Sequence, residues 1–252
     1  MGMNIKIGCC GFSVAKARYY DHFDVVEMQQ TFYQPPALKT AEKWRTEAPE
    51  NFKFTLKAWQ LITHEPSSPT YHRLRIDIPE RKKNNYGSFR PTKEVLTAWQ
   101  KTDEIATVLG TKIIIFQCPA SFMPTDEHVD NLRKFFNSID RKDYIFAWEP
   151  RGEWGEKDVK NLCADLNLVH CVDPFKREPA YTNDIIYFRL HGKGGARYRF
   201  TIDDLLWLNE KIVSRRGERP FAPTYVMFNN IYMFNDAIHF KEIIKESNLL
   251  HE

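Results

Sequence analysis

The sequence has no long apolar run, no paired cysteine motif and no low-complexity segment. No stretch approaches the roughly 18 consecutive apolar residues that a membrane-spanning helix needs, and no apolar signal region follows the opening MGMNIKIG. The five cysteines are odd in number and form no CxxC pair, a pattern typical of reduced proteins rather than of a disulfide framework. We therefore expect a soluble, cytoplasmic protein that has no membrane partner.

An excess of charge of one sign is also missing. The formal net charge is +3, which is too small by itself to indicate a nucleic-acid partner. No Gly/Ser linker or long charged run divides the chain. The 252 residues are 42% hydrophobic, which is enough for one large core. We predict that residues 1–252 form a single domain.

Short apolar runs alternate with amphipathic stretches along the whole chain. This alternation predicts parallel strands covered by helices, and eight strands of this kind indicate a TIM-like (β/α)8 barrel. The predicted strands are Ile5–Cys9, Asp24–Met28, Phe52–Lys57, Lys112–Gln117, Tyr144–Glu149, Leu168–Val172, Ile185–Leu190 and Thr224–Phe228. The predicted helices are Ala37–Ala48, Lys93–Leu109, Asp126–Ile139 (with Thr125 as N-cap), Glu156–Leu166, Ile202–Arg215 and Asn235–Glu246.

Two segments depart from this regular plan. Residues 59–92 form a long loop after the third strand, and connections of that length are usually functional or contain short elements of their own. Residues 173–184 are too few for a full sixth helix, so we predict a reduced crossing there.

Polar residues stand at the carboxyl ends of most predicted strands, where barrels carry their active sites. By the two-residue period, Arg189 and His191 lie on one row of their strand, which we expect to point into the barrel mouth. Glu149 and Asp173 each precede a proline, which holds them in the extended conformation at the rim. The full set of strand-end residues is Glu27, Lys57, Gln117, Glu149, Asp173, Arg189, His191 and Asn229.

From this set we predict a catalytic group of four residues. Lys57 and Arg189 would hold or polarise an anion, Glu149 would act as general acid or base, and His191 would transfer protons or orient Glu149. The alternative is that pairs such as Glu149 with Arg151, or Glu27 with Lys57, are structural ion pairs that close the barrel top. The predicted substrate-binding residues are Glu27, Gln117, Arg151, Asp173, Gly192, Lys193 and Asn229.

Positive charge is concentrated in two predicted mouth loops. Segments 59–92 and 191–202 together hold nine basic and three acidic residues, with aromatic residues among them: Tyr71, Tyr86, Phe89, Tyr198 and Phe200. Such a mixture suits a sugar phosphate, a nucleotide or a single nucleic-acid strand, although a solvated loop would look similar. The glycine-rich stretch HGKGGARYR after the seventh strand predicts a phosphate site, because its backbone can approach a ligand closely.

Several motifs occur in an order that resembles the YecE-like family, domain of unknown function 72. They are IGCCGFS, VVEMQQTFYQPP, KFTLKAWQLITH, FQCPASF, AWEPRGEW, YFRLHG and YVMFNN followed by NDAIHF. The resemblance covers nearly the whole chain and implies a TIM-like barrel without an established reaction. The chain departs from the family pattern at Phe12, in the short segment 11–23, and where Ile231 replaces an aspartate that here is displaced to Asp236.

Three functions follow from these residues. We favour an enzyme that acts on a small anionic substrate, and hydrolysis, lyase chemistry and isomerisation all remain compatible. A metal-dependent phosphodiesterase or isomerase would use Glu149, Asp173, His170 and His191 as ligands, but His170 and Asp173 are spaced to face opposite ways on their strand. A barrel that binds nucleic acid through its basic rim, without catalysis, is the third. We assign no metal ligand, and the cofactor stays open.

Overall fold

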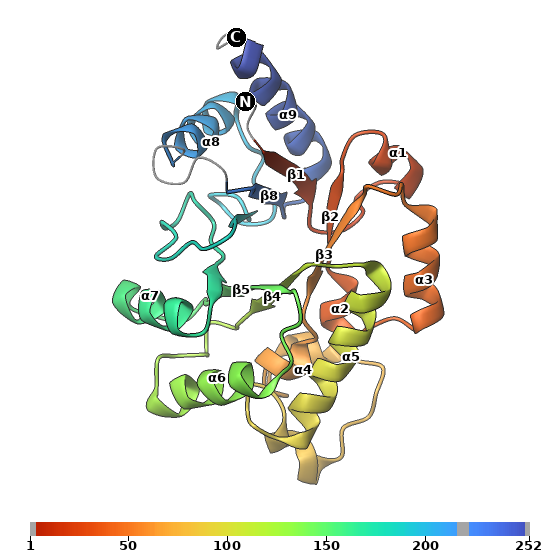
Figure 1. Ribbon diagram of the computed structural model, residues 1–252, viewed down its shortest axis with the longest axis vertical. Helices are drawn as coiled ribbons and strands as arrows, with labels where there is room; N and C mark the ends of the chain where they lie inside the picture. The colour runs from red at the N-terminus through yellow and green to blue at the C-terminus, as the bar shows by residue number, and fades with distance from the viewer. Residues whose placement is uncertain (1–3, 216–221, 250–252) are drawn as a thin grey trace.

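The strands form one closed array of parallel neighbours. The computed structural model describes residues 4–215 and 222–249, and in them an eight-stranded sheet has the order β6-β5-β4-β3-β2-β1-β8-β7. Figure 1 shows the strands at the centre of the molecule and the helices around them. The strands are β1 (Ile5–Cys9), β2 (Val25–Met28), β3 (Lys53–Lys57), β4 (Ile113–Gln117), β5 (Ile145–Glu149), β6 (Leu168–His170), β7 (Ile186–Leu190) and β8 (Thr224–Phe228).

The barrel closes between β6 and β7 through a single bridge. Val172 pairs with Phe188 in parallel, beyond the end of β6. Arg189 N donates to Val172 O at 2.9 Å, and Val172 N donates to Tyr187 O at 3.4 Å. Most other seams are longer; β7 and β8, for example, pair at five positions, although β1 and β2 pair only at Cys9 and Val26. The predicted TIM-like barrel is confirmed, although β6 ends at His170 and not at Val172.

Three of the longer helices, α5, α6 and α8, begin at a threonine whose side chain accepts a hydrogen bond from a backbone N–H of the first turn. Thr125 Oγ1 accepts from His128 N at 3.2 Å at the start of α6, and Thr201 and Asp204 form a capping box at the start of α8. Gly110 ends α5 with a φ of 64°. The α-helices are α1 (Lys16–Tyr20), α2 (Gln30–Tyr33), α3 (Leu38–Glu47), α4 (Gln60–Thr63), α5 (Lys93–Leu109), α6 (Asp126–Ser138), α7 (Glu156–Asp165), α8 (Ile202–Ser214) and α9 (Met233–Leu249).

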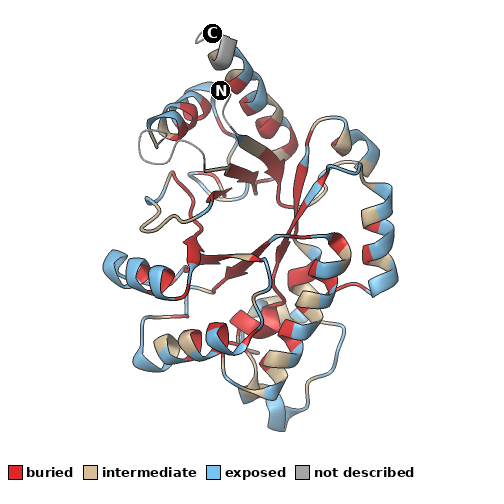
Figure 2. Ribbon diagram, viewed as in Figure 1, coloured by how far each residue is buried: buried red, intermediate tan, exposed pale blue. Residues whose placement is uncertain are grey.

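An apolar layer lies on each side of the barrel wall, one outside it under the helices and one inside it. Figure 2 shows most strand residues buried and the longer helices buried along only part of their surface, whereas the short α4 is buried throughout. The outer layer contains aromatic side chains such as Trp99, Phe116 and Phe146, which pack between the strands and the helices. The inner layer fills the barrel with Val25, Ile113, Ile115, Ala147, Val169, Cys171, Tyr187, Tyr225 and Met227. This inner layer makes the barrel a packed core, so a ligand must bind at its mouth.

Both predicted irregular segments are present. The connection after β3, the gold segment at the bottom of Figure 1, contains α4 and two 3₁₀ helices, η1 (Pro69–Arg73) and η2 (Glu80–Asn85). No helix occurs between residues 173 and 184, all of which are described. In the described ranges, no helix is both long and apolar enough to cross a membrane.

Candidate functional site

Arg189 lies at the centre of a buried charge network under the barrel mouth. Its side chain is 0% exposed. Its Nε donates to both carboxylate oxygens of Glu27, at 3.1 and 3.0 Å, and Nη2 donates to Glu27 Oε1 at 2.9 Å. Its Nη1 donates to Gln117 Oε1 at 3.2 Å and to Glu149 Oε2. Tyr187 OH donates to Glu27 Oε2 at 3.0 Å, so β2, β4, β5 and β7 are joined by one set of hydrogen bonds.

Four of the predicted strand-end residues, Glu27, Gln117, Glu149 and Arg189, therefore meet under the mouth. The structure also decides between the alternative ion pairs: Glu27 pairs with Arg189 and not with Lys57, whereas Glu149 does pair with Arg151, at 3.0 Å. Burial alone would raise the pKa of Glu149, but the charges of Arg189 and Arg151 hold that pKa well below its usual value. Glu149 is consequently an ionised carboxylate at neutral pH.

Arg151 and His191 lie above this network and contact each other. Arg151 Nη2 is 2.7 Å from His191 Nε2. Because a guanidinium can only donate, Nε2 must be the acceptor and the ring proton must be on Nδ1. Asp173 faces that nitrogen at 3.6 Å and accepts from the backbone N–H of His191 at 3.0 Å. The ring is thus held between a carboxylate on one side and a guanidinium on the other.

These three residues border a cavity of about 520 Å³ at the ends of β5, β6 and β7. The other polar lining residues are Glu149, Lys176 and Arg177. Glu149 is engaged by Arg189 and Arg151, and Asp173 accepts backbone hydrogen bonds from Phe175 and His191. The carboxylates of the cavity are therefore already partnered. Lys176 and Arg177 have no ion pair among the described residues, and Arg151 shares Glu149 with Arg189, so these three cations can attract an anion.

Lys57, at the end of β3, forms no ion pair with the described residues, although the charges of this network act on it. Its Nζ lies 3.5 Å from the centroid of the Phe32 ring, and its residue is only 4% exposed. Burial and the neighbouring charges of Arg189 and Arg151, opposed by the carboxylates Glu149 and Glu27, lower the pKa of Lys57 to about 7. A site at the barrel mouth therefore contains an amine that is partly neutral at neutral pH.

His64, which follows α4, lies against the same Phe32 ring, with ring centroids 4.9 Å apart. Burial and the positive charges of Lys57 and Arg151 lower the pKa of His64 to about 3. His64 Nδ1 is 2.8 Å from Thr63 Oγ1. His64 is therefore neutral at neutral pH and buried beside Lys57 without supplying a charge of its own.

The glycine-rich loop after β7 is shaped by tight packing. Gly192 has a φ of 83°, and a Cβ at that position would lie 2.6 Å from Tyr198 Cβ. Lys193 turns away from the cavity and pairs with Asp204 of α8. Gly195 and Ala196 line the cavity, so only part of the predicted phosphate loop borders it. Asn229 donates its backbone N–H to Leu190 O at 2.8 Å and does not line this cavity.

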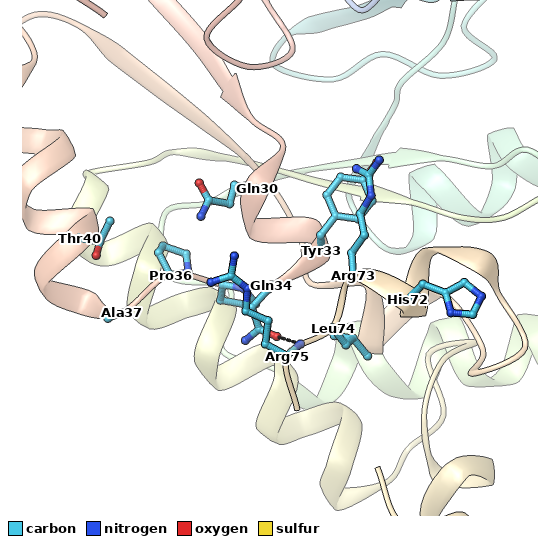
Figure 3. Close-up of a pocket in the computed structure, with 11 residues that line it drawn as sticks. Gln30, Tyr33, Gln34, Pro36, Ala37, Thr40, His72, Arg73, Leu74 and Arg75 are labelled. Carbon is cyan, nitrogen blue, oxygen red and sulfur yellow. Dashed lines mark hydrogen bonds between the residues drawn. The ribbon is translucent and has the colours of Figure 1, made fainter. Parts of the chain in front are cut away.

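A second cavity, of about 770 Å³, lies beside the mouth between α2 and the segment that includes η1. Figure 3 shows Arg73 and Tyr33 side by side, with the guanidinium carbon 4.3 Å from the ring centroid, and Arg75 beside Gln34. Among the described residues, neither Arg73 nor Arg75 has a carboxylate within ion-pair distance. Gln30, Thr40 and His72 complete its polar lining, which contains no acidic residue.

The basic loops are less uniform than the sequence indicated. Four of their cations are paired locally, Lys82 with Glu94, Lys83 with Glu80, Arg90 with Glu65 and Lys193 with Asp204. Phe89 and Phe200 are buried in the core and do not stand among the rim charges. Lys176 and Arg177 were not among the predicted site residues. They lie in the irregular segment after β6, for which we predicted only a reduced connection to the next strand. In the described residues, no group of three His, Cys, Asp or Glu side chains is placed to hold a metal ion.

Comparison with known proteins gives matches over most of the chain. The model of the family described as Protein of unknown function DUF72 matches residues 16–249. The UPF0759 protein YunF of Bacillus subtilis (strain 168) is 32% identical over 116 residues, which are 46% of this chain and 35% of that protein. The match thus spans about a third of the length of this curated relative.

Two solved structures have the same architecture. A DUF72 family protein from Enterococcus faecalis V583 superposes with a TM-score of 0.72 at 21% identity, over 97% of this chain and 98% of that one. A xylose isomerase domain containing protein from Salmonella typhimurium LT2 gives a TM-score of 0.59 at 13% identity, over 100% of both chains. At these identities the likeness shows the barrel fold alone.

Proposed function

Since this chain belongs to the DUF72 family, as its motifs indicated, and the family description names no reaction, we propose its function from the cavity at the ends of β5, β6 and β7. We infer that the protein is an enzyme that binds a small anionic substrate there. Arg151, Lys176 and Arg177 hold the anion, and His191 is the general base.

The contact between Arg151 and His191 is the observation that carries this proposal. In the free protein the guanidinium occupies the lone pair of His191 Nε2, at 2.7 Å. An anion offers Arg151 a charged acceptor, which is a stronger partner than a neutral imidazole. When Arg151 turns to the anion, the Nε2 lone pair is released and can take a proton from the substrate. Anion binding and activation of the base are thereby coupled through one side chain.

The remaining predicted residues support this arrangement. Asp173 fixes His191 through its backbone and faces Nδ1, where positive charge develops when the ring is protonated. Glu149 stays ionised and orients Arg151. Arg189 is a positioning residue, because it is fully buried and aligns Glu149 and Gln117 from below. Gly192 shapes the loop, whereas Lys193 and Asn229 have no direct role in this proposal.

The test separates binding from chemistry. We expect inorganic phosphate, pyrophosphate and sugar phosphates to raise the Tm of the protein at low salt, and the shift to shrink at high salt as charges are screened over about 10 Å at 0.1 M. Arg151→Met should abolish the shift. His191→Asn should keep it but lose turnover of whichever ester or sugar phosphate the wild type converts, followed by NMR. Lys157→Ala, on the exposed side of α7, is the charge-matched control, and Lys157→Ala with Lys160→Ala matches a change of two charges. An unchanged shift in Arg151→Met would contradict the proposal.

The second cavity favours one further candidate, a single nucleic-acid strand bound across the mouth. Its two arginines have no described carboxylate partner, and the stacked Arg73 and Tyr33 offer a flat, cationic platform of the kind that supports base stacking (Figure 3). Anisotropy of a labelled single-stranded oligonucleotide tests it. Arg73→Ala with Arg75→Ala should weaken binding and should reduce the slope of log K against log salt by the equivalent of about two phosphate contacts. Lys157→Ala with Lys160→Ala should change neither the affinity nor this slope. Equal weakening by both pairs would indicate only nonspecific attraction.

A further inference from the structure

The ammonium position of Lys57 has no hydrogen-bond acceptor and no ion-pair partner among residues 4–215 and 222–249. Lys57 ends β3 on the inner row, where it is 4% exposed. Its nearest described feature is the face of Phe32, at 3.5 Å from the ring centroid. A buried ammonium normally has carboxylate or carbonyl partners, because its desolvation is otherwise uncompensated. Only an aromatic ring, and no hydrogen-bond acceptor among the described residues, therefore favours the charged form of Lys57 by direct contact.

Charged groups from every neighbouring element act on this amine. Arg189 of β7 and Arg151 after β5 oppose its protonation, whereas Glu149 of β5 and Glu27 of β2 favour it. Both carboxylates are already paired with arginines. His64 is neutral and contributes no opposite charge. Desolvation beside other cations is the arrangement that makes a lysine nucleophilic at neutral pH.

Glu149 and Arg151 connect Lys57 to the anion cavity. Both residues line that cavity, and both lie close enough to Lys57 to influence its protonation. An anion held by Arg151 would therefore have its remaining atoms within the same mouth as the amine. A neutral amine cannot hold an anion as strongly as an ammonium, so Lys57 differs chemically from the three cations of the cavity.

We propose that Lys57 is a nucleophile that forms an imine with an aldehyde or ketone group of the anionic substrate, an inference that rests on the proposed function. The Nζ lone pair forms a bond to the carbonyl carbon, and the C=O π electrons move to the oxygen. The oxygen then leaves as water with the two hydrogens of the amine, and the C=N bond forms. No oxidant, reductant or metal is needed. The substrate class is accordingly a phosphorylated or carboxylated carbonyl compound.

Reductive trapping tests this inference directly. The protein is incubated with dihydroxyacetone phosphate, or with neutral dihydroxyacetone, in the presence of cyanoborohydride, and modified lysines are located by peptide mass mapping. We expect modification of Lys57 at least tenfold above that of Lys53, an exposed lysine on the same strand. Lys57→Arg, which keeps a cation but cannot form an imine, should lose the modification at this position. Lys57→Met serves if the arginine variant fails to fold.

The outcomes distinguish the two proposals. If Lys57 is trapped more by the phosphorylated ketone than by the neutral one, and if Arg151→Met reduces this trapping, both the anion cavity and the imine are supported. Equal trapping of the phosphorylated and neutral ketones supports the imine but refutes an anion cavity that serves it. A phosphate-induced Tm shift without any trapping at Lys57 refutes the imine and leaves the anion site standing. Trapping no greater at Lys57 than at Lys53 also refutes the nucleophile.

Discussion

Replacement of Lys57 by methionine should stabilise the protein, and the gain should depend on pH. Because the pKa of Lys57 falls from about 10.5 to about 7 on folding, the unfolded chain takes up a proton across this window and the folded chain does not. The stability of the wild type therefore decreases as pH falls from about 10.5 to about 7, and this contribution is constant below that. Methionine fills a similar volume and does not titrate.

The size of the effect follows from the shift. At about 1.4 kcal/mol per unit, the change in pKa corresponds to about 5 kcal/mol at and below pH 7. Loss of the contact between the ammonium and the Phe32 ring, worth about 2 kcal/mol at a desolvated site, opposes it. We expect a net gain of about 3 kcal/mol, or a Tm increase of about 6–12 °C for a chain of this length.

Urea unfolding of wild type and Lys57→Met at pH 7 and pH 10 measures this difference. The variant should be clearly more stable at pH 7, and its advantage should shrink or reverse at pH 10. Lys53→Met, on the same strand but exposed, should show no such dependence. If Lys57→Met is no more stable than the wild type at pH 7, the ammonium has favourable interactions that this reasoning omits, and the argument for a neutral nucleophile loses its foundation.

Three other substitutions test the framework by urea unfolding. Arg189→Ala should lower the free energy of unfolding by about 3–5 kcal/mol, because it leaves buried carboxylates unpaired; a loss below 1 kcal/mol would show that water replaces the guanidinium. Gly192→Ala should cost about 1–3 kcal/mol and more than Gly110→Ala, because only the former places a Cβ against Tyr198; equal losses would leave backbone strain as the sole cause. Thr201→Ala should cost about 0.5–2 kcal/mol through the lost cap of α8, and no change would mean that Asp204 caps the helix unaided.

The barrel itself was predictable because its strands are buried on both faces. Each strand is a short apolar run between polar stretches, and all eight were located with ends within two residues. The short helices α1, α2 and α4 were missed because four or five residues contain too little periodicity to distinguish a helix from a loop. The predicted strand Leu168–Val172 contained Val172, but its division into β6 and one isolated bridge was missed, since an isolated bridge leaves no pattern in the sequence.

The candidate site was predictable in its location but not in its pairing. Alternation along each strand places Glu27, Lys57, Glu149 and Arg189 on the inner row, and this needs no side-chain geometry. The choice of ion-pair partners, Glu27 and Glu149 for Arg189 and none of the described residues for Lys57, depends on side-chain rotamers and on the tilt of the strands. A sequence does not encode either of these locally. For the same reason Lys193 was expected above an anion but reaches Asp204 across its own loop.

The single bridge between β6 and β7 has a consequence for motion in the barrel. Segments with few backbone hydrogen bonds open at a lower free energy than the rest of a fold, so amide exchange should be faster on either side of this seam than along the five-pair seam between β7 and β8. Val172, Asp173 and His191 line the cavity directly above it. Local opening of the seam would therefore change the spacing between Asp173 and His191 without disturbing the other seven strand pairings. A ligand that spans the cavity would bridge the seam, and we expect it to slow exchange at Val172 and Arg189 more than at any residue of β1.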